Sequence, residues 1–253
     1  MAMVKTTGVD ELRLIGLLWR DAPASPRSGI STRGITAQAV ALADRDGLEA
    51  VTIRALAQEA GVTAMALYPH IGGRAELVEL MLDHVAGTVY VANTPPGGPD
   101  WRARVTAVAD ANWASCQAHP WVTDLATGRP VPGPGAADKY ETELRALEGT
   151  GLTDVEMEHT LTALLAMVQG TARAALAAQR ARGAGEDADT GWWSAIEPTL
   201  TAAIGDPDRF PVAARVSRAL GEQTGRANDP EGAYQAGLDL MLHGIAQAAA
   251  ASS

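Results

Sequence analysis

Residues 52–70, TIRALAQEAGVTAMALYPH, hold the pattern that decides the fold: a helix, a turn with a glycine, and a second short helix. From Ile53 to Ala60 the apolar residues recur at positions i, i+3, i+4 and i+7, which is the spacing of one helical face. Gly61 is expected to end this helix, because glycine adopts the left-handed conformation of a helix end at little cost. The second helix is expected to start at Thr63.

This spacing lets two helices cross at a steep angle over a small shared core, predicted to contain Leu56, Ala60, Val62 and Leu67. The second helix then projects its first turn outward, as entry into the major groove of DNA requires. An ordinary corner between two helices has the same periodicity. The periodicity by itself therefore leaves DNA binding open.

Helical periodicity also extends through the rest of the chain, and no strand pattern competes with it, so the predicted fold class is all-α. A helix is expected after Thr36, a candidate N-cap, and it should stop at Asp46 and Gly47. A longer helix should begin at Arg74. Further helices are predicted near residues 101–117, 135–149, 153–182, 189–204, 208–220 and 230–250.

Proline and glycine divide the chain into three parts. Residues 1–34 are predicted to be a flexible N-terminal arm, with a possible short amphipathic helix through Leu12, Ile15 and Trp19. The stretch 93–100, with three prolines and two glycines, marks a boundary. Residues 35–92 should thus form one domain with a connecting helix, and residues 93–253 a second.

The composition indicates a globular chain, because 47% of the 253 residues are hydrophobic and 20% are charged. Cys116 is the single cysteine, which excludes an intrachain disulfide and a cysteine-cluster metal site and suits a reducing cytoplasm. The apolar segment 161–178 contains Gln169 and Arg173, so a buried helix is expected there and no membrane span. No metal site and no cofactor are predicted.

The net charge of −10 argues at first against a nucleic-acid partner. Its distribution matters more, because residues 1–76 hold eight basic and eight acidic side chains, whereas the excess acid lies in residues 77–253. An acidic body with a neutral head can point that head at a polyanion, since the body is repelled from it.

Residues 35–85 resemble the DNA-binding domain of the TetR family of transcriptional regulators, with many positions in order and at the correct spacing. The matching segments are Asp46-Gly47-Leu48, Thr52–Arg54, Ala60-Gly61-Val62, Ala66-Leu67-Tyr68 with His70, and Arg74-Ala75-Glu76-Leu77. The segments His119-Pro120-Trp121, Gly237-Leu238-Asp239 and Met241-Leu242 resemble, more loosely, the ligand-binding half of tetracycline-repressor-like actinobacterial regulators. The resemblance implies an N-terminal three-helix helix-turn-helix domain and a C-terminal helical domain for ligand binding and dimerisation.

The same resemblance implies a set of DNA contacts. Thr63, Ala64 and Met65 would face the bases. Because Ala64 and Met65 have no strong hydrogen-bond donors, recognition of the base sequence would depend on van der Waals contact, including contact with thymine methyl groups. The remaining residues implied in binding the phosphate backbone are Thr52, Arg54, Tyr68, His70 and Arg74, the last where the family usually has lysine.

Two features near this surface are less regular. Pro69 lies at the end of the second helix, where it removes an amide and disfavours helical geometry at Tyr68, so the helix is expected to end at about Leu67–Tyr68. The arm carries Arg27 and Arg33, which could track phosphates or enter a minor groove. A solvated linker is an equal alternative for the arm.

The helices near 153–182 and 230–250 are predicted to form a homodimer interface, because small residues permit close helix approach and the family pairs such helices. The residues placed on these stripes are Leu161, Leu164, Leu165, Val168, Ala172 and Ala175, and Gly237, Met241, Gly244, Ile245 and Ala248. Two-fold symmetry would then set two recognition helices about one DNA turn apart, roughly 34–36 Å.

An apolar cavity for a drug-sized ligand is expected within residues 101–204, where most tryptophans lie. The candidate contacts are Trp113, Trp121, Tyr140, Leu164, Met167, Val168 and Trp192. Core packing is the alternative for each aromatic residue taken alone.

The overall prediction is a cytoplasmic repressor, not an enzyme, that binds a palindromic operator in double-stranded DNA as a dimer and is released by a small, mostly apolar inducer. The alternatives are a helical enzyme or an interaction module with a hydrophobic pocket and no DNA role. Against an enzyme, the sequence has no paired carboxylates at a convincing spacing, no nucleophile motif and no phosphate loop.

Overall fold

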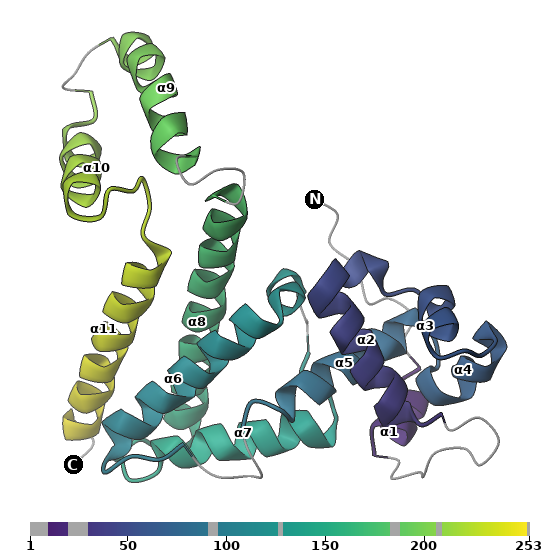
Figure 1. The fold of residues 1–253 in the computed structure, drawn as a ribbon. Helices are drawn as coiled ribbons and strands as arrows, with labels where there is room; N and C mark the ends of the chain where they lie inside the picture. The colour runs from purple at the N-terminus through teal and green to yellow at the C-terminus, as the bar shows by residue number, and fades with distance from the viewer. Residues whose placement is uncertain are drawn as a thin grey trace.

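The structure is a computed structural model that describes residues 10–19, 30–90, 96–125, 129–182, 188–205 and 209–251. Within these ranges every regular element is a helix, which confirms the all-α class (Figure 1). The elements are α1 (Glu11–Leu18), α2 (Thr32–Asp46), η1 (Leu48–Ala50), α3 (Ile53–Glu59), α4 (Ala64–Ile71), α5 (Arg74–Ala86), α6 (Trp101–Ala118), η3 (Pro120–Asp124), α7 (Pro134–Leu147), α8 (Asp154–Arg182), α9 (Ala188–Ile204), α10 (Pro211–Thr224) and α11 (Pro230–Ala251).

Helices α1 to α5 form the N-terminal unit around one apolar core. Leu56 of α3 and Leu67 of α4 are completely buried there, and Ala60 and Val62 pack against them, as the sequence predicted. Thr52 caps α3, since its Oγ1 accepts a hydrogen bond from the amide of Ala55 at 3.1 Å.

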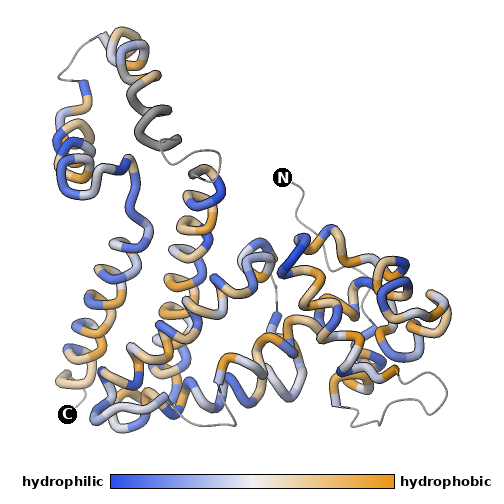
Figure 2. Tube along the Cα trace, in the orientation of Figure 1, coloured by the Kyte–Doolittle hydropathy of each residue, from blue (hydrophilic) through white to orange (hydrophobic). Residues whose placement is uncertain are grey.

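Helices α6, α8 and α11 form a second core, which α7 completes from one end (Figure 1). Leu161, Leu164 and Val168 of α8 point into it, and Tyr234 and Leu238 of α11 face them. Figure 2 shows the result as apolar and polar residues alternating along α8 and α11. Helices α9 and α10 lie beyond the ends of this group, on the side away from α3 and α4 (Figure 1).

The two units meet where α5 crosses the start of α7. The Asp83 carboxylate of α5 accepts a hydrogen bond from the amide of Ala136 at 2.9 Å, and so caps a helix whose own N-cap, Gly133, has no side chain. A Cβ atom at Gly133 would lie 2.1 Å from Asp83 Oδ1, and one at Gly135 would lie 2.2 Å from the Asp83 carbonyl oxygen. The close approach of α5 and α7 therefore requires Gly135, whereas a side chain at Gly133 would displace the Asp83 carboxylate from its capping position.

A second joint connects α2 to the end of α6. The Asp44 carboxylate of α2 accepts a hydrogen bond from the Trp121 indole at 2.7 Å, and His119 Nδ1 lies 2.8 Å from the same oxygen. Trp121 is buried in the N-terminal core although it follows α6 in the chain. The two units thus share part of one core.

The start of α2 was predicted too late in the chain. The helix begins at Thr32, because Ser31 rather than Thr36 is the N-cap and its side chain accepts from the amide of Gly34. Arg33 consequently lies in the first turn of a helix and not in a flexible arm.

The predicted helix in residues 1–34 is present, but its predicted apolar face was wrong; Arg27 lies outside the described residues. Helix α1 exists, but it buries Leu14, Leu17 and Leu18, whereas the expected residues Leu12, Ile15 and Trp19 are exposed. Both sets fit a helical period, and only the position of α5 decides which set is covered.

The predicted end of the second helix of the helix-turn-helix was also wrong. Helix α4 continues through Pro69 to Ile71 and ends at Gly72, whose φ is +73°. Ile71 is completely buried, so packing of the last turn offsets the amide that proline lacks.

Helix α8 is long and apolar enough, by length and composition, to cross a membrane. Its buried face packs against α6 and α11, as expected of a core helix of a soluble domain. By itself this helix is weak evidence for a membrane span.

Candidate DNA-contact surface and ligand cavity

The first turn of α4 projects from the N-terminal unit. Thr63 is its N-cap in an extended conformation, and Met65 is 75% exposed although it is a large apolar residue. Ala64 is half-buried. Leu67 of the same helix is buried in the N-terminal core, whereas the Met65 side chain points to the exterior.

Most residues predicted to bind phosphate are at least partly exposed on the N-terminal unit. Arg54 and Tyr68 are exposed, with Tyr68 at 39%, and His70 is half-buried in the last turn of α4. Thr52 is exposed, and its hydroxyl is used as the cap of α3. Arg33 is exposed at the start of α2, and together with burial it lowers the pKa of His84.

Arg74 is a predicted phosphate contact whose guanidinium already has partners within the N-terminal unit. Its guanidinium donates to the carbonyl oxygens of Val51 and Leu48, the latter at 3.4 Å, and it lies 3.7 Å from the Glu49 carboxylate. Arg74 therefore ties the start of α5 to the segment before α3, and its role in this structure is to hold the helix-turn-helix together.

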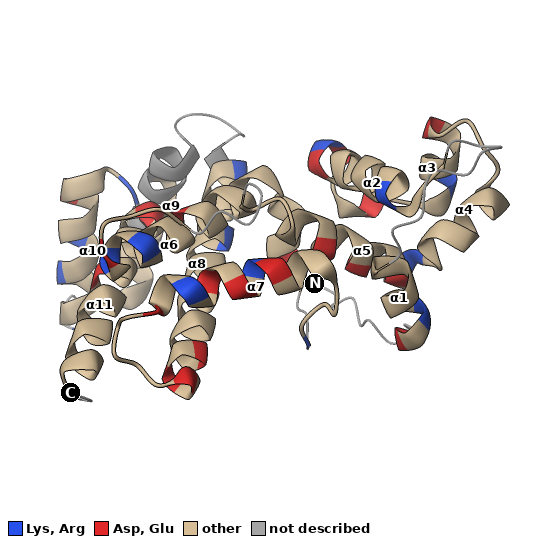
Figure 3. Cartoon of the chain, turned by 90° about the horizontal axis from the view of Figure 1, so that it is seen from below, with Lys and Arg blue, Asp and Glu red and all other residues tan. Residues whose placement is uncertain are grey.

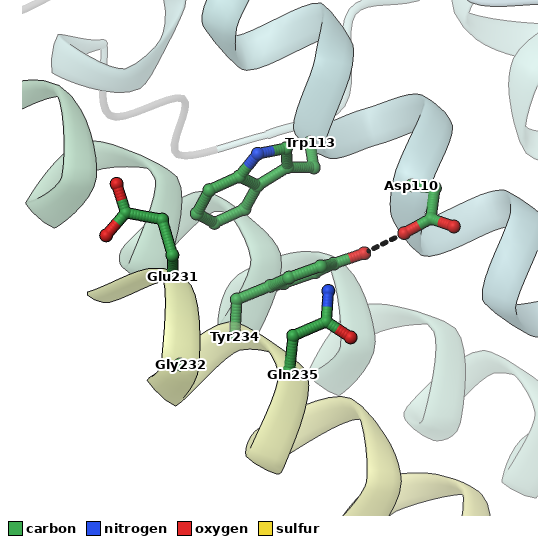
Figure 4. Close-up of a pocket in the computed structure, with 6 residues that line it drawn as sticks. All are labelled: Asp110, Trp113, Glu231, Gly232, Tyr234 and Gln235. Carbon is green, nitrogen blue, oxygen red and sulfur yellow. Dashed lines mark hydrogen bonds between the residues drawn. The ribbon is translucent and has the colours of Figure 1, made fainter. Parts of the chain in front are cut away.

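A cavity of about 450 Å³ lies in the C-terminal unit between α6 and α11 (Figure 4). Its lining residues are Asp110, Trp113, Glu231, Gly232, Tyr234 and Gln235. The rings of Trp113 and Tyr234 pack with their centroids 4.4 Å apart, and the Tyr234 hydroxyl donates to Asp110 Oδ1 at 2.6 Å. Burial, and then the neighbouring Asp110, raise the pKa of Tyr234, so it remains a neutral donor.

Of the predicted ligand residues, Trp113 alone lines this cavity within the described part of the chain. Trp121 lies in the N-terminal core, and Tyr140 is an exposed residue of α7 that donates to Glu158 at 2.6 Å. Leu164 and Val168 are buried in the C-terminal core with Met167 packed beside them. The side chain of Trp192 lies outside the described residues.

Trp121 and Tyr140 therefore do not line this cavity, because Trp121 is buried in the N-terminal core and Tyr140 is exposed on α7. Asp110 and Tyr234 also line the cavity, although neither was among the predicted ligand residues. The i, i+3 spacing of Asp110 and Trp113 was a visible signal, since it sets a carboxylate beside an indole on one helical face.

A buried polar cluster lies on the opposite side of α6. Glu143 is 1% exposed in its side chain, and its Oε1 accepts from Asn112 at 2.6 Å and Tyr90 at 2.9 Å and pairs with Lys139 at 2.7 Å. Burial raises the pKa of Tyr90. Each of these groups has a partner, so the cluster fixes α7 against α6.

No group of three or more histidine, cysteine, aspartate or glutamate residues among the described ranges is placed to hold a metal ion. Cys116 is buried, and burial raises the pKa of its thiol, which makes it a packing residue rather than a reactive one.

Comparison with known proteins identifies both units. Residues 35–81 match the bacterial regulatory proteins of the tetR family, and residues 94–249 match the tetracyclin repressor-like C-terminal domain. The HTH-type transcriptional repressor DrrR1 of Streptomyces coeruleorubidus is 33% identical over 218 residues, which cover 84% of this chain and 80% of that protein.

Solved structures agree with this assignment. The TetR regulator SCO7222 of Streptomyces coelicolor is 29% identical, with a TM-score of 0.64 over 86% of this chain and 98% of that one. Apo ActR of the same species shares the fold, with a TM-score of 0.69 at 24% identity over 92% of this chain and 100% of that one.

The chain belongs to the TetR family of transcriptional regulators. Its N-terminal unit is the helix-turn-helix DNA-binding domain of that family, and its C-terminal unit is the ligand-binding domain.

The contacts of Arg74 predict a stability effect that requires no DNA. Arg74→Ala should lower the free energy of unfolding by about 1 kcal/mol, because it removes two hydrogen bonds from a charged donor to backbone carbonyls. Thermal unfolding followed by circular dichroism measures this, with Arg54→Ala as the matched control, since Arg54 is exposed and should melt as the parent protein does. Equal melting temperatures for all three proteins would contradict the structural role.

Proposed function

We propose that the protein is a cytoplasmic, dimeric repressor that binds a palindromic operator and is released by a small aromatic ligand. The observation that carries this proposal is the exposed first turn of α4, with Met65 at its tip and Arg54 on the neighbouring helix. A protruding apolar residue next to a basic one suits a groove whose floor presents thymine methyl groups and whose walls are phosphates.

The charge distribution supports this orientation. Helix α4 carries no Asp or Glu, whereas acidic residues lie along α7 and the start of α8 (Figure 3). The acidic ligand-binding half repels a polyanion, whereas the N-terminal unit carries no net charge. This difference favours an orientation in which α3 and α4 face the DNA.

A substitution at Arg54 tests the DNA contact. Arg54→Ala should weaken binding to the DNA upstream of the protein's own gene and lower the slope of log affinity against log salt concentration by about 1, as loss of one phosphate contact requires. Fluorescence anisotropy over a salt series gives both values. Arg45→Ala is the matched control, because Arg45 forms ion pairs with Asp46 and Glu59 within the N-terminal unit. An equal loss in both variants would indicate a general effect of charge.

Helices α8 and α11 remain the proposed dimer interface, but the faces that meet the partner differ from those predicted from the sequence. Leu161, Leu164 and Val168 are buried within the subunit, so they cannot meet a partner. The opposite faces are exposed and consist mainly of small residues. These are Ala163, Ala166, Gly170, Ala174 and Ala177 on α8, and Ala236, Leu240 and Gly244 on α11.

Leu240 is 74% exposed on this face, which is unusual for a leucine in a core helix. Two copies of α8 and α11 would cover it in a four-helix interface, since glycine and alanine let helix axes approach closely. The two heads would then lie on one side of the assembly, as a palindromic operator requires.

Leu240 therefore provides the test of the dimer. Leu240→Glu should raise the dissociation constant of the dimer by roughly 100-fold or more, because it places an unpaired charge in an apolar interface. Sedimentation equilibrium measures the change. Leu12→Glu introduces the same charge at a leucine that is 85% exposed on α1, and it should leave the assembly state unchanged. Dimers that withstand Leu240→Glu would place the interface elsewhere.

The ligand proposal rests on the cavity between α6 and α11. Its Trp113 and Tyr234 rings offer a flat apolar surface for a planar ligand, while Asp110 and Glu231 place carboxylates at its edge. Arg226 lies 3.6 Å from Glu231, whereas Asp110 is exposed and accepts a hydrogen bond from the neutral Tyr234 hydroxyl. A largely apolar aromatic molecule with a positively charged group fits this arrangement. ActR, which shares the fold, has been crystallised with actinorhodin.

The route from this cavity to the DNA-binding half is short. Asp110 and Trp113 lie on α6, and His119 at the end of the same helix contacts Asp44 of α2. A ligand that shifts α6 therefore acts on α2 through one rigid element. A coupling free energy of about 1–3 kcal/mol is usual between two such sites.

A pair of planar probes tests the ligand chemistry. The cationic dye proflavine should bind and quench tryptophan fluorescence, and the anion anthraquinone-2-sulfonate should bind much more weakly. Asp110→Asn should weaken proflavine binding by roughly tenfold, as loss of one partly solvated charge contact implies. Asp138→Asn, on α7 away from the cavity, is the control. Equal affinity for both probes, or no effect of Asp110→Asn, would contradict the assignment.

A further inference from the structure

Helix α1 precedes the part of the chain that matches the DNA-binding family, which begins at residue 35. We propose that α1 is a strap that ties the end of the recognition helix to residues 129–133, the segment that leads into α7 of the ligand-binding half. The proposal requires neither an operator nor a ligand, because it concerns contacts within one chain.

One part of α1 is fixed to the DNA-binding unit. Leu14, Leu17 and Leu18 are buried in its core, so α1 moves with that unit. The Arg13 guanidinium donates to the carbonyl oxygen of Tyr68 at 2.9 Å. This oxygen also accepts from the amide of Gly72 at 3.0 Å, which closes the last turn of α4. Arg13 thus holds the end of α4 where phosphate contacts are expected.

The opposite end of α1 reaches the ligand-binding half. The indole N–H of Trp19 donates to the carbonyl oxygen of Pro132 at 2.8 Å, across 113 positions of sequence. Trp19 is 58% exposed, so burial of its ring does not account for this position. The hydrogen bond to Pro132 is its specific contact.

Arg129 adds a second connection to the same segment. Its guanidinium lies 3.8 Å from Glu11 of α1 and 3.8 Å from Glu79 of α5. Glu79 is almost completely buried, and burial raises the pKa of its carboxyl while Arg129 opposes the rise. Residues 129–133 are therefore held by α1 from one side and by α5 from the other.

These contacts act in series. Residues 129–133 end at Gly133, next to the first turn of α7, where the Ala136 amide donates to Asp83. A movement of α7 is thus transmitted through Pro132 and Trp19 to a helix that holds Tyr68 by Arg13. Since the buried leucines keep α1 rigid on the head, the strap resists changes in the angle between the two halves.

Hydrogen exchange of the full-length protein, without DNA or ligand, tests the strap at two amides. Gly72 reports on the end of α4, and Ala136 reports on the start of α7. Trp19→Phe removes the indole donor and keeps an aromatic ring. Arg13→Gln removes the charge at the other end. Both side chains are exposed, so both variants should retain the fold, which circular dichroism checks.

Each variant is expected to speed exchange at the distant amide as well as the near one, by about fivefold, which is the equilibrium effect of one ordinary net hydrogen bond. Leu12→Ala, at an exposed residue of the same helix, should change neither amide. Faster exchange at the distant amide supports the strap. A change confined to the mutated end, or no change at either amide, would overturn it.

Discussion

The capping of α7 by Asp83 is the constraint on which the arrangement of the two halves depends. Helix α7 begins with Pro134 after a glycine N-cap, so its first amides require an acceptor from elsewhere in the chain. Asp83 of α5 supplies that acceptor and also places a negative charge at the positive end of the helix. Burial raises the pKa of this carboxyl, whereas the amide hydrogen bonds from Ala136 and Gly135 lower it. Helix α5 is thereby fixed to the ligand-binding half by a buried carboxylate that accepts hydrogen bonds from the start of α7.

The N-terminal unit is stabilised by a core of its own and by a residue from the ligand-binding half. Leu56 and Leu67 give the head a core of its own, and Trp121 extends that core into the second unit. Met65, in the first turn of α4, lies outside this core and is exposed. Buried and exposed apolar residues thus occupy opposite faces of one helix.

The ligand-binding half shows how packing and binding compete for the same residue types. Its leucines and valines fill the core between α6, α8 and α11, and the cavity lies at the edge of this core, where Trp113 meets Tyr234. Carboxylates at the cavity edge are compatible with folding because they reach solvent or a hydroxyl donor. The same placement gives the cavity a polar edge that an entirely apolar pocket does not have.

The sequence by itself determined most of the helices, their order, and the position of the helix-turn-helix. The period of 3.6 residues, the Thr52 cap and the left-handed Gly61 are local properties, and local properties can be read without knowing what packs where. The family motifs in residues 35–85 further supplied most of the proposed DNA contacts. Only the tertiary structure decided which face of α1, α8 and α11 is covered, that α4 continues through Pro69, and that Trp121 serves the N-terminal core. Each of these outcomes depends on a partner distant in the chain, and a helical period is satisfied equally well by a residue that packs and by one that remains exposed.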